Sequence, residues 1–227
     1  MNNTSLLFLE KQKQEWLKKY GLDSKSILSF RAKIKQATKE VQESLGEELL
    51  KLISKKSFQD DYEKALELIY RGANIEFKNE KKGDFPLLIC ARKNYVKTFF
   101  AFIKAGANVN QTNNYLTTVT MASARHGNKE ILQTLILLNA DINARCLDGD
   151  NAIMSAKRHE QVECFQMLVN AQAYLNNQNL QNQTLFDLPG NIEINPFLLE
   201  DYSIPEPDPS VLLEEAQLKL IKIKNDR

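Results

Sequence analysis

The sequence predicts an all-α solenoid, a linear stack of similar helix pairs, and three observations lead to this prediction. A motif that begins Gly72-Ala73-Asn74-Ile75 recurs three times further along the chain. A second motif, which begins at Phe85-Pro86, recurs in the same register. Each period also contains a polar turn, an apolar helix with small residues and a second apolar helix. Landmarks that share one period indicate a repeat protein, whose units bury their apolar faces by stacking. The alanines of the first motif are spaced by 34, 33 and 33 residues, at Ala73, Ala107, Ala140 and Ala173.

Residues 1–45 are predicted to form two helices ahead of the repeats. The first helix covers residues 5–20. The second is capped by Asp23 or Ser24 and continues to Leu45, because its apolar residues step by three and four. We expect the two helices to form a hairpin that caps the first repeat. The alternative is a separate surface that pairs with a partner's helix.

Residues 46–190 are predicted to form the repeats. Pro86 suits the first turn of a helix, where its missing N–H leaves no hydrogen bond unmade. The first helix of a unit is expected to end at Asn94 or Gly127, residues that accept a left-handed backbone. Glu160 holds this place in the following unit and is expected to strain or reshape the turn. The predicted units are an irregular one at 46–77, three clear ones at 78–110, 111–143 and 144–176, and a decayed one at 177–190.

Residues 191–227 are predicted to form a Pro-containing connector and a C-terminal helix. Prolines up to Pro209 fit an extended connector, and Asp208 can cap the helix that follows. This segment holds four basic and eight acidic residues, so it is the acidic end of the chain. The helix either folds back on the last repeat or presents its apolar face to a partner.

The repeated units resemble ankyrin repeats. The family's Gly-Ala-Asp-Val-Asn ending is well kept, for example as Gly106-Ala107-Asn108-Val109-Asn110. Its Thr-Pro-Leu-His opening is degraded, for example to Phe85-Pro86-Leu87-Leu88, and no unit keeps the histidine. The resemblance implies an ankyrin-repeat solenoid with β-turn fingers and helical caps at both ends. It also implies a non-catalytic module that binds a protein partner through a concave groove and the fingers.

Composition argues against several functional classes. With 30 basic and 29 acidic side chains the net charge is +1, which does not suit a protein that coats nucleic acid. No apolar segment is long enough to span a membrane, and no basic leader precedes an apolar one. Three cysteines without metal-ligand spacing fit a reducing compartment. We therefore expect a monomeric cytoplasmic protein without nucleic acid, metal or cofactor.

The residues with catalytic chemistry do not form a recognisable active site. His126 and His159 hold the same place in adjacent repeats, and stacked units would keep them about 10 Å apart. No cysteine is placed to act as a nucleophile with either histidine. A glycine-rich phosphate loop and a His-Glu-x-x-His metal motif are both absent from the sequence. An enzyme is therefore not expected. The alternative is an enzyme whose unrecognised site lies in the flanks.

Three arginines, Arg92, Arg125 and Arg158, recur at intervals of 33 residues late in the first helix of each clear unit. In the ankyrin arrangement this place faces the groove. The arginines are therefore expected to form a ladder that binds carboxylates or phosphate on a partner with an acidic surface. The alternative is a row of solvated surface charges. The candidate binding residues are Arg92, Lys93, Arg125, His126, Arg158, His159, Lys81, Lys82, Asp84, Asn114, Tyr115, Leu147 and Asp148.

Two fingertip residues and one asparagine carry separate hypotheses. Tyr115 and Leu147 would make good interface anchors if exposed, although Leu147 could instead tuck against a neighbouring finger. Asn143 follows Asp141-Ile142 in a context that resembles ankyrin asparagines hydroxylated by a eukaryotic oxygenase. The alternative role for Asn143 is that of a plain turn residue.

The composition also bears on the origin of the protein. It is rich in Lys, Asn, Gln and Ile, and together with the degraded repeats it resembles ankyrin proteins that intracellular bacteria deliver into eukaryotic cells. This resemblance implies an effector that is secreted into a host cell. Whether binding inhibits, regulates or scaffolds a partner enzyme stays open at this point.

Overall fold

The computed structural model describes residues 3–192, and this part of the chain contains ten helices and no strand. The prediction of an all-α fold is confirmed. A single sheet-type bridge joins Thr112 to Thr118. Within the described residues no helix combines the length and apolar character needed to cross a bilayer. The helices are α1 (Asn3–Lys19), α2 (Ser24–Arg31), α3 (Lys39–Ser54), α4 (Tyr62–Tyr70), α5 (Pro86–Lys93), α6 (Val96–Ala105), α7 (Val119–His126), α8 (Lys129–Leu137), α9 (Ala152–Arg158) and α10 (Val162–Asn170).

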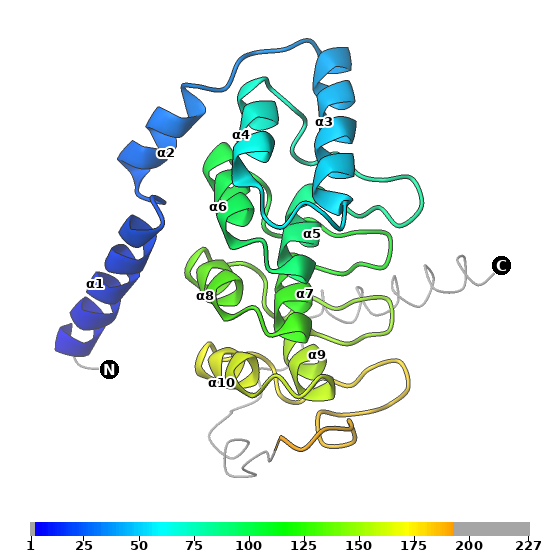
Figure 1. The fold of residues 1–227 in the computed structure, drawn as a ribbon. Helices are drawn as coiled ribbons and strands as arrows, with labels where there is room; N and C mark the ends of the chain where they lie inside the picture. The colour runs from blue at the N-terminus through cyan, green and yellow to red at the C-terminus, as the bar shows by residue number, and fades with distance from the viewer. Residues whose placement is uncertain (1–2, 193–227) are drawn as a thin grey trace.

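Helices α5 to α10 form three successive units in two rows. The inner helices α5, α7 and α9 follow one another in one row, and the outer helices α6, α8 and α10 form the second row (Figure 1). The inner helices pack directly on one another because small buried residues, Cys90, Ser123 and Ala156, hold one repeated position. The loops that precede the inner helices, here called the fingers, project together to one side of the stack (Figure 1).

The short turns inside the units adopt the left-handed backbone that the sequence predicts. Asn94 and Gly127 end their helices with φ angles of 56° and 71°. Glu160 has a φ of 55° at the same place, so the predicted departure is tolerated as strain and the turn keeps its shape. A non-glycine residue in this region costs about 1 kcal/mol or more. Stacking of the neighbouring units therefore overrides the local preference of Glu160.

The predicted single helix from Ser24 to Leu45 is wrong. Helix α2 ends at Arg31, and α3 starts at Lys39, so the apolar stripe is divided between two helices. The break is fixed by tertiary contacts, since the backbone N–H of Lys35 donates to the carbonyl of Tyr70 at the end of α4 (2.8 Å). Helix α3 also crosses the predicted domain boundary at 45/46, and its Leu49 is fully buried in the core of the repeats.

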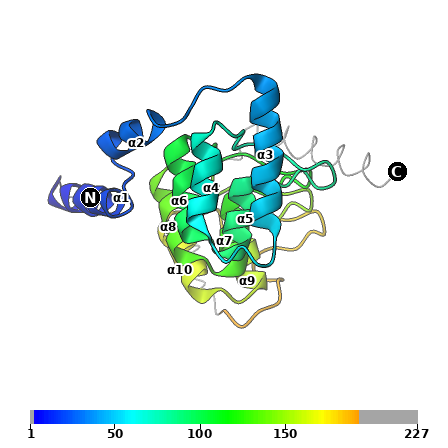
Figure 2. The same ribbon diagram turned by 45° about the horizontal axis from the view of Figure 1, so that its top comes forward.

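Helices α1 and α2 do not form a hairpin over the end of the stack. They follow one another along the outer side of the stack, beside the outer helices α6 and α8 (Figures 1 and 2). The ring of Tyr20 stacks on Phe100 of α6, with 4.1 Å between centroids, and the indole N–H of Trp16 donates to Thr134 Oγ1 of α8 (3.1 Å). Helices α1 and α2, predicted to cap the first repeat, therefore cover the outer face of the stack instead.

The far end of the described stack is closed by residues 177–192, which contain no helix. Leu185 and Leu188 are buried against α9 and α10. Lys157, at the repeated position that Ala124 holds one unit earlier, is only 5% exposed. Its ammonium group donates to the carbonyl oxygens of Gly190 (3.1 Å) and Ile192 (2.9 Å). The predicted connector and the predicted C-terminal helix fall almost wholly on residues 193–227, which lie outside the described residues.

Candidate functional site

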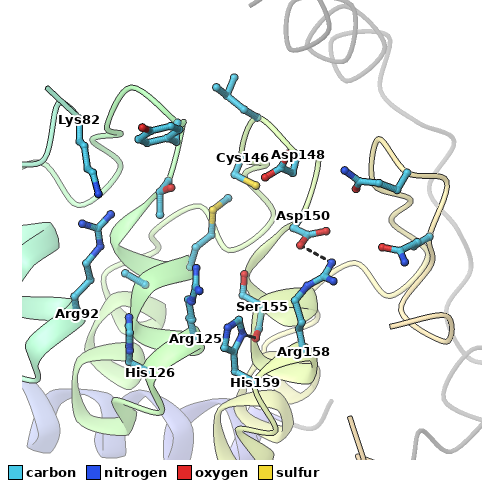
Figure 3. Close-up of a pocket in the computed structure, with 17 residues that line it drawn as sticks. Lys82, Arg92, Arg125, His126, Cys146, Asp148, Asp150, Ser155, Arg158 and His159 are labelled. Atoms are coloured by element: carbon cyan, nitrogen blue, oxygen red, sulfur yellow. Dashed lines mark hydrogen bonds and ion pairs between the residues drawn. The ribbon is translucent and has the colours of Figure 1, made fainter. Parts of the chain in front are cut away.

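An open groove of about 1060 Å³ lies between the fingers and the inner helices α7 and α9. The inner helices form the floor of the groove, and the finger loops form its wall (Figure 3). Successive units build it, so it exists only because the units stack. The lining residues are Lys82, Arg92, Tyr115, Thr117, Met121, Ala122, Arg125, His126, Cys146, Leu147, Asp148, Asp150, Ser155, Arg158, His159, Gln181 and Gln183.

The three repeated arginines stand in a row in this groove (Figure 3). Each comes from the last turn of an inner helix, because the 33-residue period matches one unit of the stack. Two of the three, however, are held by neighbouring carboxylates. Arg92 pairs with Asp84 (2.6 Å) and Arg158 pairs with Asp150 (2.9 Å). Partner binding by the predicted ladder stays a prediction, but two of its three guanidinium groups already have an internal partner.

An asparagine from the next finger completes each pair. Asn113 Nδ2 donates to the second carboxylate oxygen of Asp84 (2.8 Å), and Asn179 Nδ2 does the same for Asp150 (3.0 Å). The two carboxylate groups are only 10% and 15% exposed. Each arginine, carboxylate and amide thus forms a partly buried network that ties one finger to the next. Asp84 is consequently a structural residue and not the fingertip contact that the sequence predicts.

Arg125, in the middle unit, lacks this network. Thr117 stands at the place of the aspartate, and Cys146 stands at the place of the asparagine. Arg125 is exposed, and no side chain within residues 10–192 accepts a hydrogen bond from its guanidinium group or pairs with it. Of the repeated arginines in the described chain, this is the one whose side chain is open to a partner.

The residues that follow the arginines have diverse roles. The ammonium group of Lys93 donates to the carbonyl of Ser54 (2.9 Å) at the end of α3, so Lys93 closes that helix. The ring of His159 bonds through Nδ1 to the carbonyl of Ser155 (2.9 Å). The pKa of His126 is lowered below 6.5, first by partial burial of the ring and then by the neighbouring charge of Arg125. His126 is therefore mainly neutral near pH 7.

The predicted fingertip residues separate into exposed and buried groups. Lys81, Lys82, Asn114 and Asp148 are exposed, and the side chain of Tyr115 is 50% exposed at the rim of the groove. Leu147 is only 8% exposed, and its backbone N–H donates to the carbonyl of Tyr115 (3.0 Å). The alternative that Leu147 tucks against a neighbouring finger is therefore the one the structure supports.

Comparison with known proteins agrees with this architecture. A family model described as ankyrin repeats (3 copies) matches residues 52–146 and 101–182, which together span more than half of the chain. The chain belongs to the ankyrin-repeat family. Ankyrin repeats are in general non-catalytic and suggest a module for protein–protein interaction.

Among curated proteins, the chain is similar to inversins. Inversin of Gallus gallus is 24% identical over 124 residues, which are 55% of this chain and 11% of that protein. The inversins of Canis lupus familiaris and Mus musculus are each 26% identical over 102 residues, or 45% of this chain. These regions are 9% and 10% of the two relatives. The chain therefore matches about a tenth of the length of each of these relatives.

Asn143 has a structural partner in the next ankyrin unit. Its Oδ1 accepts a hydrogen bond from the backbone N–H of Tyr174 (2.8 Å). Asn110, one unit earlier, makes the same link to the N–H of Asp141 (2.9 Å). The side chain therefore joins successive fingers, as expected for a turn residue at a repeated position. Hydroxylation of Asn143 stays a prediction.

The three thiols of this ankyrin chain are kept protonated. Burial raises the pKa of Cys146 and raises that of Cys90 well above its ordinary value. The pKa of Cys164 is raised to about 11, first by burial and then by the charge of Glu163. Thiolate is the nucleophilic form, so these cysteines are suited to packing. Within the described residues, no three His, Cys, Asp or Glu side chains gather as metal ligands.

Sequence reasoning missed the residues that distinguish the three arginines. Asn113 and Asn179 lie 29 residues after Asp84 and Asp150, and each arginine lies eight residues after its aspartate. This repeated spacing is visible in the sequence. Its meaning requires the folded structure, in which the arginine and the asparagine both bind the same carboxylate between stacked fingers.

Proposed function

We propose that this protein is a non-catalytic, monomeric module that holds a segment of a protein partner in the groove between the ankyrin fingers and the inner helices. The observation that carries the proposal is the continuous groove of about 1060 Å³ that successive units build together. Its walls are helices and fingers held by repeated hydrogen bonds. Because this surface is already ordered, binding of a partner costs little free energy for ordering it.

The residues on the groove surface suit a polypeptide partner. Tyr115 offers a half-exposed aromatic ring at the rim, and Arg125 on the floor offers a guanidinium group that pairs with no side chain of residues 10–192. Lys82 adds a second cation, and it reaches from its finger toward the same row (Figure 3). Aromatic and arginine side chains dominate the energetics of protein interfaces. The groove therefore favours a partner segment with an apolar anchor and acidic side chains.

The experiment selects peptides from a random display library on the intact chain and measures their affinities for two tyrosine variants. Tyr115→Ala removes the ring in the groove, while Tyr174→Ala removes a ring of similar exposure (45%) outside it. We expect Tyr115→Ala to weaken binding by about tenfold, the loss typical of an interface anchor. Tyr174→Ala should leave the affinities unchanged. Selected peptides that bind both variants as well as the original chain would contradict the groove as the binding surface.

Charge reversal of all three arginines is not a clean test of this function. Glutamate at position 92 would face the buried carboxylate of Asp84, so the variant would lose stability as well as charge. Of the three arginines, Arg125 is the one that can be changed without breaking an ion pair of the described residues. Regulation, inhibition or scaffolding of a partner enzyme would use the same groove, with binding as the activity. A cytoplasmic location, secretion as an effector and the chain's bacterial origin stay predictions.

A further inference from the structure

The middle unit of the groove lacks the internal carboxylate that its two neighbours have, and this difference indicates which chemical group a ligand would supply there. We propose that Arg125 is a receptor for a carboxylate side chain, supplied by an acidic segment of a partner protein. The aspartate or glutamate of that segment would take the place that Asp84 and Asp150 take in the flanking units. This inference rests on the proposed function of the groove and names the chemistry of its occupant.

The flanking units show how this fold satisfies a guanidinium group at this position. In each, one carboxylate oxygen accepts from the arginine eight residues later, at 2.6 and 2.9 Å. The other oxygen accepts from the asparagine 29 residues later, at 2.8 and 3.0 Å. Two copies with the same residue types, the same spacing and the same division of the carboxylate oxygens define a template. The preferred neighbour of the repeated arginine is a carboxylate that lies between an inner helix and the next finger.

In the middle unit both halves of the template are replaced. Thr117 carries a neutral hydroxyl in place of the carboxylate, and Cys146 carries a thiol in place of the amide donor. Burial raises the pKa of that thiol, so Cys146 supplies no negative charge either. A threonine side chain is also shorter than an aspartate. The arginine therefore keeps its charge and its five donors while the internal acceptor is missing.

The surroundings of Arg125 favour an acidic occupant. The charges of Arg92 and Arg158 on either side are already balanced by their own aspartates, so they do not compete for an incoming carboxylate. Lys82 is exposed on the adjacent finger wall. Charge complementarity of this kind increases the rate of association and discriminates against wrong partners. A bidentate carboxylate–guanidinium pair adds directional selectivity.

The test measures binding of a fluorescent hexaglutamate peptide to the full chain at low ionic strength, with hexaglutamine as the neutral probe. Thr117→Asp places the missing carboxylate in the chain, and the double variant Thr117→Asp/Cys146→Asn rebuilds the whole template. If Arg125 is the receptor, each variant should weaken hexaglutamate binding by about tenfold, the effect of losing one charge-assisted pair. The double variant should also unfold at a higher temperature, because its internal pair is formed.

A charge-matched control separates this effect from a change in net charge. Gln166→Glu adds one negative charge on the outer helix α10, where Gln166 is exposed and does not line the groove. Hexaglutamate affinity of Gln166→Glu should stay within about twofold of the original, since exposed charges far from the site are screened. Should the double variant fail to fold, Arg125→Gln provides the same comparison, because Arg125 has no ion pair to lose within the described residues.

Each outcome decides for or against the carboxylate receptor. Equal binding of hexaglutamate to Thr117→Asp and to Gln166→Glu overturns it, and so does a lack of binding to the original chain. Binding that emerges only after residues 193–227 are removed identifies the chain's own acidic end as the occupant and overturns a separate partner. A failure of the proposed groove function gives a different result. In that case the library peptides bind Tyr115→Ala as tightly as the original chain.

Discussion

The two sides of the ankyrin stack are held by different kinds of contact. On the outer side, α1 and α2 are fixed by aromatic contacts such as Tyr20 on Phe100, between residues far apart in the sequence. On the inner side, the same polar network recurs in the first and the third unit, around Asp84 and Asp150. The outer side is thus covered by the chain itself. The described residues leave the inner side open, and the middle unit stacks without this network at Arg125.

The largest expected loss of stability comes from a substitution on the outer side of the stack. Phe30 of α2 is 8% exposed and packs on Tyr70 with 5.2 Å between ring centroids. Phe30→Ala should lower the free energy of unfolding by about 3 kcal/mol, because it removes a buried aromatic ring and leaves a cavity. Urea denaturation measures this loss. Leu28→Ala on the same helix, at a side chain that is 68% exposed, should have almost no effect.

The same comparison explains what the sequence could and could not predict. The turns that end the first helices in the middle of the chain were predictable, because the units repeat the same residue types there, as at Asn94 and Gly127. The break between α2 and α3 was not predictable, because the apolar spacing runs through it without interruption. Only the contact of Lys35 with the end of α4 shows why the helix stops. A periodic sequence predicts repeated structure. A contact that occurs only once produces no periodic pattern in the sequence and cannot be predicted in this way.

The candidate site divides in the same way. The row of arginines was predictable from its period, since equal spacing places equivalent residues on one face of the stack. Which arginine is available was not, because pairing depends on Asp84 and Asp150 lying under the fingers in the folded chain. Leu147 illustrates the same limit, since its burial depends on how one finger leans on the next.

The second prediction sharpens the contrast within the inner side. Asp84→Ala removes a carboxylate that holds both Arg92 and Asn113, and it should cost about 2 kcal/mol in the free energy of unfolding. Thr117→Ala, at the equivalent position of the middle unit, should cost less than about 0.5 kcal/mol, since it breaks no network. Chemical denaturation of both variants provides the measurement. Equal losses would contradict the assignment of Asp84 as structural.

The third prediction concerns the end of the described stack. Lys157→Met keeps an unbranched side chain, shorter by one atom, but removes its hydrogen bonds to the carbonyls of Gly190 and Ile192. We expect a loss of about 1 kcal/mol, with faster amide hydrogen exchange confined to residues 184–192. Lys129→Met, at an exposed lysine of α8, is the matched control and should not alter exchange there. Uniformly faster exchange across all units would show that Lys157 supports the whole stack instead.

The smallest expected effect is a pH dependence that originates in the groove. The folded pKa of His126 lies below its ordinary value of 6.5, first because of burial and then because of Arg125 and its neighbours. As the pH falls below about 7, the unfolded chain therefore takes up a proton at this residue before the folded chain does. Stability should decline across that interval and level off below the folded pKa. Because the ring is partly exposed, solvent screening limits the loss to a few tenths of a kcal/mol.

His126→Gln should remove this contribution, which thermal unfolding measured between pH 5 and pH 8 can detect as a flatter profile. A second measurement connects the titration to Arg125. If the guanidinium charge helps to lower the pKa of His126, Arg125→Gln should raise that pKa toward 6.5 in an NMR titration. A carboxylate bound at Arg125 should shift it in the same direction, because it neutralises the same charge. His126 is thus a reporter of whether the open position in the middle unit is occupied. A pKa unmoved by Arg125→Gln would assign the shift to burial and to the other neighbouring charges, and would remove this use.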